Sequence, residues 1–97
     1  MGNVDFIALT QTYLEENFSD CNIVKVDRVD AAEDLCFEVR SSKTRYFLRI
    51  QKEVLDDQEN GESYETLLHN YQVATTMKGL GDFPVVVTLY GCIFGSP

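Results

Sequence analysis

His69 is the only histidine in this sequence and the first residue to test for catalytic or metal-binding chemistry. A general base needs a nucleophile or a substrate group placed beside it, and a metal ion needs several ligands. At helical spacing the neighbours of His69 are Glu65 and Val73, which supply one further ligand at most. We therefore interpret His69 as a surface or half-buried helix residue. The sequence predicts no catalytic, cofactor-binding or metal-binding residue.

Three cysteines, Cys21, Cys36 and Cys92, form an odd set without a C-x-x-C pair or the spacing of a zinc site. No histidine can be assigned to any of them as an activating base, so no cysteine nucleophile is predicted. The first residues lack the basic start and apolar run of a signal peptide, and no apolar stretch reaches the ~20 residues of a membrane helix. We expect a cytoplasmic protein with reduced thiols and no membrane partner, and we do not expect an enzyme.

The stretch from Glu53 to Met77 contains six acidic residues and no basic residue. Its first part places oxygen ligands at alternate positions and Gly61 in the sixth, as an EF-hand calcium loop does. The twelfth position holds Leu67 instead of the bidentate glutamate, so a solvated acidic surface is favoured over a calcium site, and cation binding stays open. The acidic docking surface that we predict consists of Asp56, Asp57, Glu59, Glu62 and Glu65.

Charge is distributed unevenly along the 97 residues of the chain. The formal net charge is −8, yet seven of the eight basic residues lie between Lys25 and Lys52. A strongly acidic chain repels nucleic-acid phosphates at long range, so no nucleic-acid partner is expected, although Phe47 stands among arginines. The residues expected on the outer, solvent-facing side of the strands are Lys25, Asp27, Glu38, Arg40, Arg45, Phe47 and Arg49.

Two segments carry apolar residues at the spacing of an amphipathic helix, Val4–Phe18 and a second from about Ser63 to Lys78. Ser63 is placed to cap the start of the second helix, and Gly79 is placed to end it. A polar, acidic connection over residues 53–62 precedes this second helix.

Three stretches between the helices alternate apolar and polar residues, which is typical of an antiparallel meander with one buried face. They are Ile23–Val29, Leu35–Arg40 and Arg45–Gln51. The strongest strand signal of the chain follows the second helix, at Phe83–Tyr90. The predicted order is α-β-β-β-α-β, an α+β two-layer sandwich in which an antiparallel meander and a C-terminal strand carry both helices on one face. We expect a single domain over residues 1–97.

Both sides of the predicted C-terminal strand are largely apolar, and residues 92–94 add further apolar surface. Two helices on one face leave the other side of this strand uncovered in so small a chain, and an exposed apolar patch marks an association surface. We therefore expect a symmetric homodimer that forms through this strand. The candidate interface residues are Val86, Thr88, Tyr90, Ile93 and Phe94.

In element order, acidity and size, the chain resembles class I type III secretion chaperones. The resemblance implies a dimer that binds a client protein, and it carries over no functional residue. The sequence as a whole favours a small acidic protein-binding module without catalytic activity that self-associates through its C-terminal strand. One alternative is an acidic inhibitor or nucleic-acid mimic that docks on a basic protein surface through residues 53–65. The other is a type III secretion chaperone-like protein.

Overall fold

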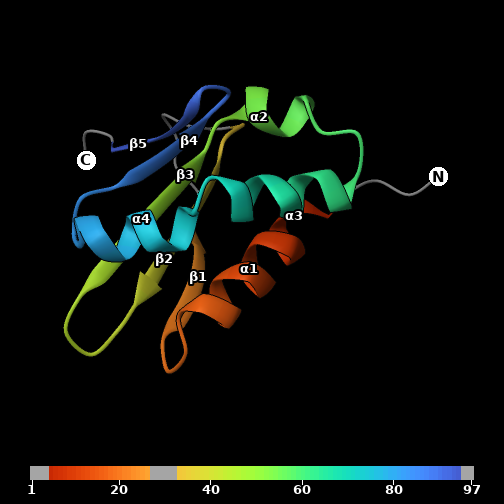
Figure 1. Cartoon of the computed structure of the whole chain (residues 1–97). Helices are drawn as coiled ribbons and strands as arrows, with labels where there is room; N and C mark the ends of the chain where they lie inside the picture. The colour runs from red at the N-terminus through yellow and green to blue at the C-terminus, as the bar shows by residue number, and fades with distance from the viewer. Residues whose placement is uncertain (1–4, 27–32, 95–97) are drawn as a thin grey trace.

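A five-stranded mixed sheet with helices on one of its faces forms the fold (Figure 1). The computed structural model describes residues 5–26 and 33–94. In chain order its elements are α1 (Phe6–Asn17), β1 (Asn22–Val26), β2 (Leu35–Arg40), β3 (Arg45–Ile50), α2 (Lys52–Asp56), α3 (Gly61–Asn70), α4 (Val73–Leu80), β4 (Val85–Thr88) and β5 (Gly91–Phe94). The strands lie in the order β1-β2-β3-β4-β5 and are antiparallel except for the parallel pair β3 and β4. The predicted α+β class is confirmed.

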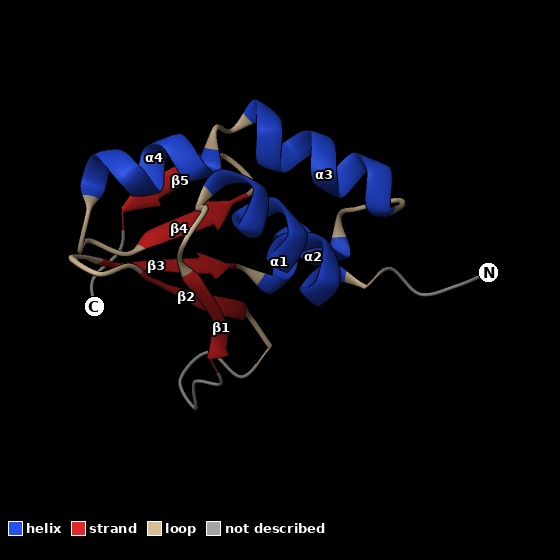
Figure 2. Cartoon of the chain, turned by 90° about the horizontal axis from the view of Figure 1, so that it is seen from below, coloured by secondary structure: helices blue, strands red, loops and turns tan. Residues whose placement is uncertain are grey.

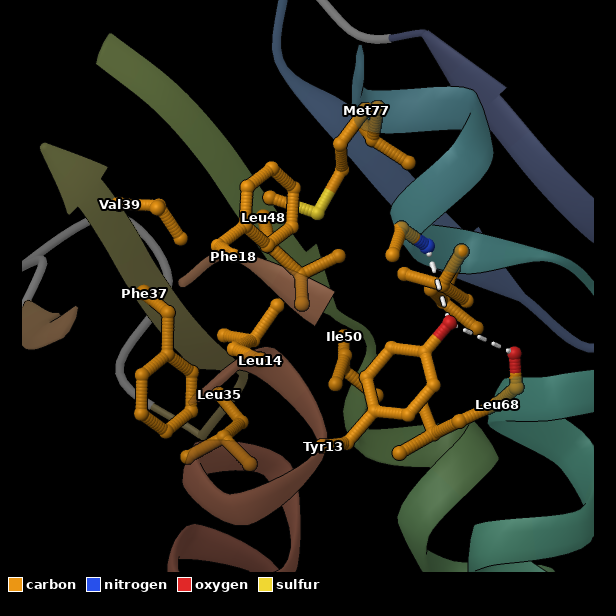
Figure 3. Packing of buried hydrophobic residues seen from close by; sticks show 14 of the residues in the cluster. Tyr13, Leu14, Phe18, Leu35, Phe37, Val39, Leu48, Ile50, Leu68 and Met77 are labelled. Carbon is orange, nitrogen blue, oxygen red and sulfur yellow. Dashed lines mark hydrogen bonds between the residues drawn. The ribbon is translucent and has the colours of Figure 1, made fainter. Parts of the chain in front are cut away.

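The apolar core lies between the sheet and the helices, which Figure 2 shows on one side of the strands. Its side chains come from alternate strand positions and from the inner stripes of the helices, as Figure 3 shows for part of the cluster. Burying a Leu, Ile, Phe or Met side chain contributes about 1.5–3 kcal/mol, so this cluster is the main stabilising element. Fully buried members include Leu14, Phe37, Leu48, Ile50, Tyr64, Leu68 and Met77.

The second predicted helix is interrupted. The sequence predicted one helix over about 63–78, but the structure has α3 and α4 with Gln72 between them in the left-handed conformation (φ 51°, ψ 48°). The Tyr13 hydroxyl donates to the Leu68 carbonyl (3.3 Å) and accepts from the Ala74 amide (3.0 Å), the two dashed lines of Figure 3. A continuous helix would pair these backbone groups internally, so a contact from α1 stabilises the break.

The acidic connection is partly helical. The sequence predicted a polar linker, but α2 begins at Lys52 and buries Val54 completely. Asn60, and not the predicted Ser63, caps α3: its side chain accepts from the Ser63 amide (2.8 Å), and the Ser63 hydroxyl accepts from the Asn60 amide (3.4 Å). This reciprocal pair is a capping box, and it gives the polar residues of the connection a structural role.

The C-terminal part has one more strand than predicted. α4 continues through Gly79 and ends before Gly81, whose positive φ of 63° glycine adopts at little cost. The predicted strand over Phe83–Tyr90 is shortened to β4, and a turn at residues 89–90 leads into β5. β4 therefore lies inside the sheet, between β3 and β5, and β5 forms the edge.

The face of β1 that meets the helices is the opposite of the one predicted. Lys25 lies opposite Phe37, a core residue, and therefore belongs to the face that the helices cover. Val24 and Val26 lie on the other face, which no helix covers in the described residues; we call it the open face. Alternation in a strand has period two, so it separates two sets of side chains without showing which set meets the core. Asp27, predicted to share the outer side with Lys25, lies outside the described residues.

Candidate functional site

The hairpin of β4 and β5, residues 85–94, carries the most exposed large apolar side chain among the described residues. Tyr90 is 98% exposed at its tip, beside Leu89 at 45%, and Ile93 on β5 is 55% exposed. From residue 79 to residue 94 the sequence has one charged residue, Asp82. Exposed apolar side chains in an uncharged segment are a candidate association surface. We refer to residues 85–94 as the C-terminal hairpin.

Two of the predicted interface residues, Val86 and Ile93, lie opposite each other on the open face. Val86 is half-buried because strands flank it on both sides, whereas Ile93 is exposed at the edge of the sheet. The backbone of Phe94, a third predicted residue, pairs with Val85. The side chain of Phe94 lies outside what the structure describes.

Of the other two predicted interface residues, Thr88 is the last residue of β4 and Tyr90 lies in the turn that follows it. Thr88 is buried, and its hydroxyl donates to the Gly91 carbonyl (2.9 Å) and accepts from the Tyr90 amide (3.1 Å). Gly91 has a φ of 125°, a conformation that L side chains rarely adopt. The Thr88 hydroxyl therefore stabilises the turn through its hydrogen bonds, and the Tyr90 side chain projects from the turn into solvent.

β5 is an edge strand with no charged residue. It pairs with β4 on one side, and no described strand pairs with its other side. The sequence of β5, Gly-Cys-Ile-Phe, contains neither a lysine nor a proline. Lysine, proline and inward-pointing charges are the usual devices that stop a sheet edge from pairing with another chain. β5 has none of these, and among the described strands none pairs with the backbone N–H and C=O groups on its outer side.

A row of five side chains crosses the open face from one sheet edge to the other. Successive strand pairings place them side by side: Val26, Cys36, Arg49, Val86 and Ile93. Arg49 is the charged member, and its Nε donates to Asp34 Oδ2 at 2.6 Å. The row is apolar at both ends, and its β5 end is the more exposed.

The remaining charges of the open face are arranged in ion pairs. Glu38, whose side chain is 8% exposed, lies 3.1 Å from the Arg40 guanidinium and 3.7 Å from that of Arg45. Phe47 lies opposite Glu38 on the next strand and is 37% exposed. The prediction that Glu38, Arg40, Arg45, Phe47 and Arg49 share this face is confirmed. Ion pairs with one exposed partner contribute about 0–1 kcal/mol, so they compensate charge more than they stabilise.

Two contacts hold the C-terminal hairpin against the helical layer. The Cys92 thiol donates to the Tyr71 carbonyl (3.8 Å), and the Tyr71 hydroxyl donates to the Leu89 carbonyl (3.4 Å). Cys92 faces the core side of β5, and burial raises the pKa of its thiol. The hairpin is therefore fixed to the junction of α3 and α4, and its exposed side chains project from a supported strand.

The predicted acidic docking surface lies on α2, on α3 and in the turn between them. Its five members are all exposed: Asp56, Asp57, Glu59, Glu62 and Glu65. Asp56 pairs with Lys52 across one helical turn (3.4 Å), which raises the pKa of that lysine. Asp57 and Glu59 also line a shallow hollow of about 390 Å³ beside α3. Within residues 5–26 and 33–94, no group of three or more His, Cys, Asp or Glu residues is arranged to hold a metal ion.

His69 lies on the surface of α3, and its ring meets the edge of the Tyr13 ring with centroids 5.2 Å apart. A cleft of about 290 Å³ between α1 and α3 brings His69 close to Glu16 and Glu65. The Tyr13 hydroxyl in its wall already bonds two backbone groups, and burial raises the pKa of Tyr13. The three cysteines are free thiols.

No protein-family model matches this sequence, and comparisons with curated proteins and with solved structures gave no match either. In the described ranges, no helix has the length and apolar character needed to cross a membrane. Sequence reasoning missed β5 as a separate strand, although Gly91, placed after a run of apolar residues, is the signal that could have revealed the turn.

Proposed function

We propose that this chain is a small acidic protein-binding module without catalytic activity, and that it self-associates through its C-terminal hairpin. The observation that carries the proposal is an uncharged edge strand, β5, which contains the exposed Ile93 and directly follows the exposed Leu89 and Tyr90. Burying apolar surface is worth about 25 cal/mol per Å², so covering these side chains favours association. The free thiols fit a reducing compartment, and we expect a cytoplasmic location.

The charge distribution supports the choice of this surface. Each copy has a net charge of −8, so two copies repel each other over most orientations. The acidic residues of α2 and α3 concentrate this charge on the helical layer. The C-terminal hairpin has no charged residue, and Asp82 is the nearest one along the chain. Two copies therefore approach each other with the least repulsion through the hairpin.

The proposal is tested by size exclusion coupled to light scattering over a range of concentrations, on the wild type and two variants. Ile93→Lys places a charge on the edge strand, and we expect it to be a folded monomer under conditions where the wild type is a dimer. Ile7→Lys is the matched control, because Ile7 is an exposed isoleucine of the helix α1, at 41%. It introduces the same charge change and should leave the dimer intact.

Two results would overturn the proposal. The first is a wild type that stays monomeric at millimolar concentration. The second is a dimer that resists Ile93→Lys while circular dichroism shows the variant folded. Loss of the dimer in Ile7→Lys alone would likewise move the interface away from the C-terminal hairpin.

A second candidate function is docking of the acidic surface on a basic protein. The exposed carboxylates from Asp56 to Glu65 favour it, since the sequence from Glu53 to Met77 contains no basic residue. Binding to poly-lysine that weakens steeply as salt is added would support it, and absence of binding at low salt would reject it. A secretion chaperone-like role differs from both, because it requires a dimer that also captures a client chain.

A further inference from the structure

We infer that two copies of this chain join β5 to β5, antiparallel and around a twofold axis perpendicular to the sheet, into one continuous ten-stranded sheet. The inference rests on the proposed self-association and specifies how it occurs. Each copy contributes five strands, and β5 is the terminal strand of each. The occupant of the β5 edge is therefore a second copy of the same strand.

The two edges of the sheet differ in the way that this inference requires. β1 carries Lys25 on the face that the helices cover, and an inward-pointing charge on an edge strand opposes pairing with another chain. β5 carries no charge on either face. Because only the β5 edge lacks such protection among the described strands, edge pairing is directed to it.

The antiparallel arrangement follows from closure. A strand that pairs with its own copy around a twofold axis perpendicular to the sheet runs antiparallel to it and uses up both edges at once. The helices of both copies then lie on the same face, and the open faces join into one surface. Pairing of β5 with a different edge would leave further edges exposed and would continue as an open chain.

The register follows from the alternation of side chains. A twofold axis perpendicular to the sheet keeps the two faces the same in both copies, so residues directly opposite each other must point to the same face. One residue of β5 must therefore lie opposite its own copy, and the central choices are Cys92 and Ile93. A register centred on Cys92 places Ile93 opposite Gly91. A register centred on Ile93 pairs the two isoleucines on the open face and covers both.

We assign the register centred on Ile93. Its side chain is 55% exposed and lies opposite Val86, so a second isoleucine extends an existing apolar row. Cross-strand pairs of β-branched residues stabilise a sheet by ~0.2–1 kcal/mol relative to alanine. Cys92 points to the other face, where its thiol bonds the Tyr71 carbonyl. It gains nothing comparable from a copy of itself.

The interface is small by the standard of stable complexes. A strand of four residues is roughly 13 Å long, and a standard interface buries about 800 Å² on each partner. We therefore expect a weak dimer whose population rises with protein concentration.

Cysteine trapping tests the strand pairing and the register separately. Ile93→Cys is made with Cys21→Ser and Cys92→Ser, which leaves only the buried Cys36 in addition. The matched control is Ile7→Cys in the same background, and a third protein retains Cys92 with Cys21→Ser and Ile93 unchanged. Under glutathione oxidation, we expect the Ile93→Cys chains to cross-link about tenfold faster than the control, because opposite residues of paired strands reach disulfide geometry. Mass spectrometry identifies the linked peptides.

The outcomes distinguish this inference from the proposed function. A dimer by light scattering with no faster cross-linking of Ile93→Cys would overturn the β5 pairing and leave self-association standing. Cross-linking through Cys92 in place of Ile93→Cys would overturn the assigned register. A wild type that is monomeric throughout would overturn both proposals. Hydrogen exchange on the unmodified chain gives an independent readout: the amides of β5 should become slower to exchange as concentration rises, and unchanged rates in a dimer would also overturn the pairing.

Discussion

The two edges of the sheet are built from similar apolar residues, yet they differ in the placement of a single charge. β1 contains Val24 and Val26 on the open face and Lys25 on the face that the helices cover. β5 contains Ile93 on the open face and no charged residue. A lysine that would have to be buried if another sheet were added makes edge pairing at β1 unfavourable. This difference indicates that the charge of Lys25 opposes association at the β1 edge, whereas no charge opposes it at the β5 edge.

The edges differ also in how the helical layer supports them. α1 lies over β1, and its Tyr13 reaches across to the junction of α3 and α4. α4 lies over β4 and β5, and Cys92 bonds the Tyr71 carbonyl at the same junction. Gln72, in the left-handed conformation, therefore lies close to the contacts that both Tyr13 and Cys92 make at this junction. These contacts connect the β1 side of the molecule to the β5 side.

Lys25→Val should have the largest effect on the state of association, because it removes the charge that opposes pairing of the β1 edge with another chain. With both edges open, we expect dimers to join through β1 into open-ended assemblies, seen as a strong rise in scattered light at concentrations where the wild type is a dimer. Lys43→Val is the control, since Lys43 is exposed in the turn between β2 and β3 and carries the same charge. A Lys25→Val protein that remains a dimer would remove the proposed difference between the edges.

Tyr13→Phe should have the next largest effect, on the stability of each subunit. The substitution removes the hydroxyl that bonds the Leu68 carbonyl and the Ala74 amide, and it leaves these buried groups without that partner. We expect the free energy of unfolding to fall by about 1–3 kcal/mol, measured by urea denaturation. Tyr90→Phe is the control, because the Tyr90 side chain is exposed and its loss of a hydroxyl should leave the unfolding free energy unchanged. Equal effects of both substitutions would contradict the role assigned to Tyr13.

Salt should have the smallest effect, and its sign separates the two candidate surfaces. Added salt screens the repulsion between two chains of net charge −8, so the dissociation constant of the dimer should fall by a small factor. Docking of the acidic surface on poly-lysine should instead weaken as salt rises. Light scattering for the dimer and titration for poly-lysine measure both trends. A dimer that weakens steeply with salt would point to an interface held by ion pairs.

The pattern of apolar residues predicted most of the fold. Strict alternation placed Glu38, Arg40, Phe47 and Arg49 on one face of the meander, and helical spacing located α1. The break between α3 and α4 could not be predicted in this way, since the stabilising hydroxyl comes from Tyr13, far away along the chain. The face of β1 was predicted wrongly because this strand carries apolar residues on both faces, Ile23 on one and Val24 and Val26 on the other. Its pattern therefore gives little preference for either face.

The predicted interface residues were also placed correctly in part and wrongly in part. Exposure of Tyr90 and Ile93 agrees with the surface position that the sequence predicted for them. Thr88 was predicted on the same surface, yet it is buried and bonds the Gly91 carbonyl and the Tyr90 amide within the turn. Alternation places a side chain on a face, but it does not show whether a local turn has already used its hydrogen-bonding groups.

Residue types and their spacing determined the class of fold, the acidic segment from residue 53 to residue 65 and the uncharged C-terminal segment, because these depend on local pattern and on composition. The tertiary structure alone decided that β4 lies inside the sheet, that β5 forms its edge and that Lys25 faces the helices at the opposite edge. The order of the strands, and the face of each strand that meets the core, depend on which distant segments pack together. An alternation of period two does not contain that information.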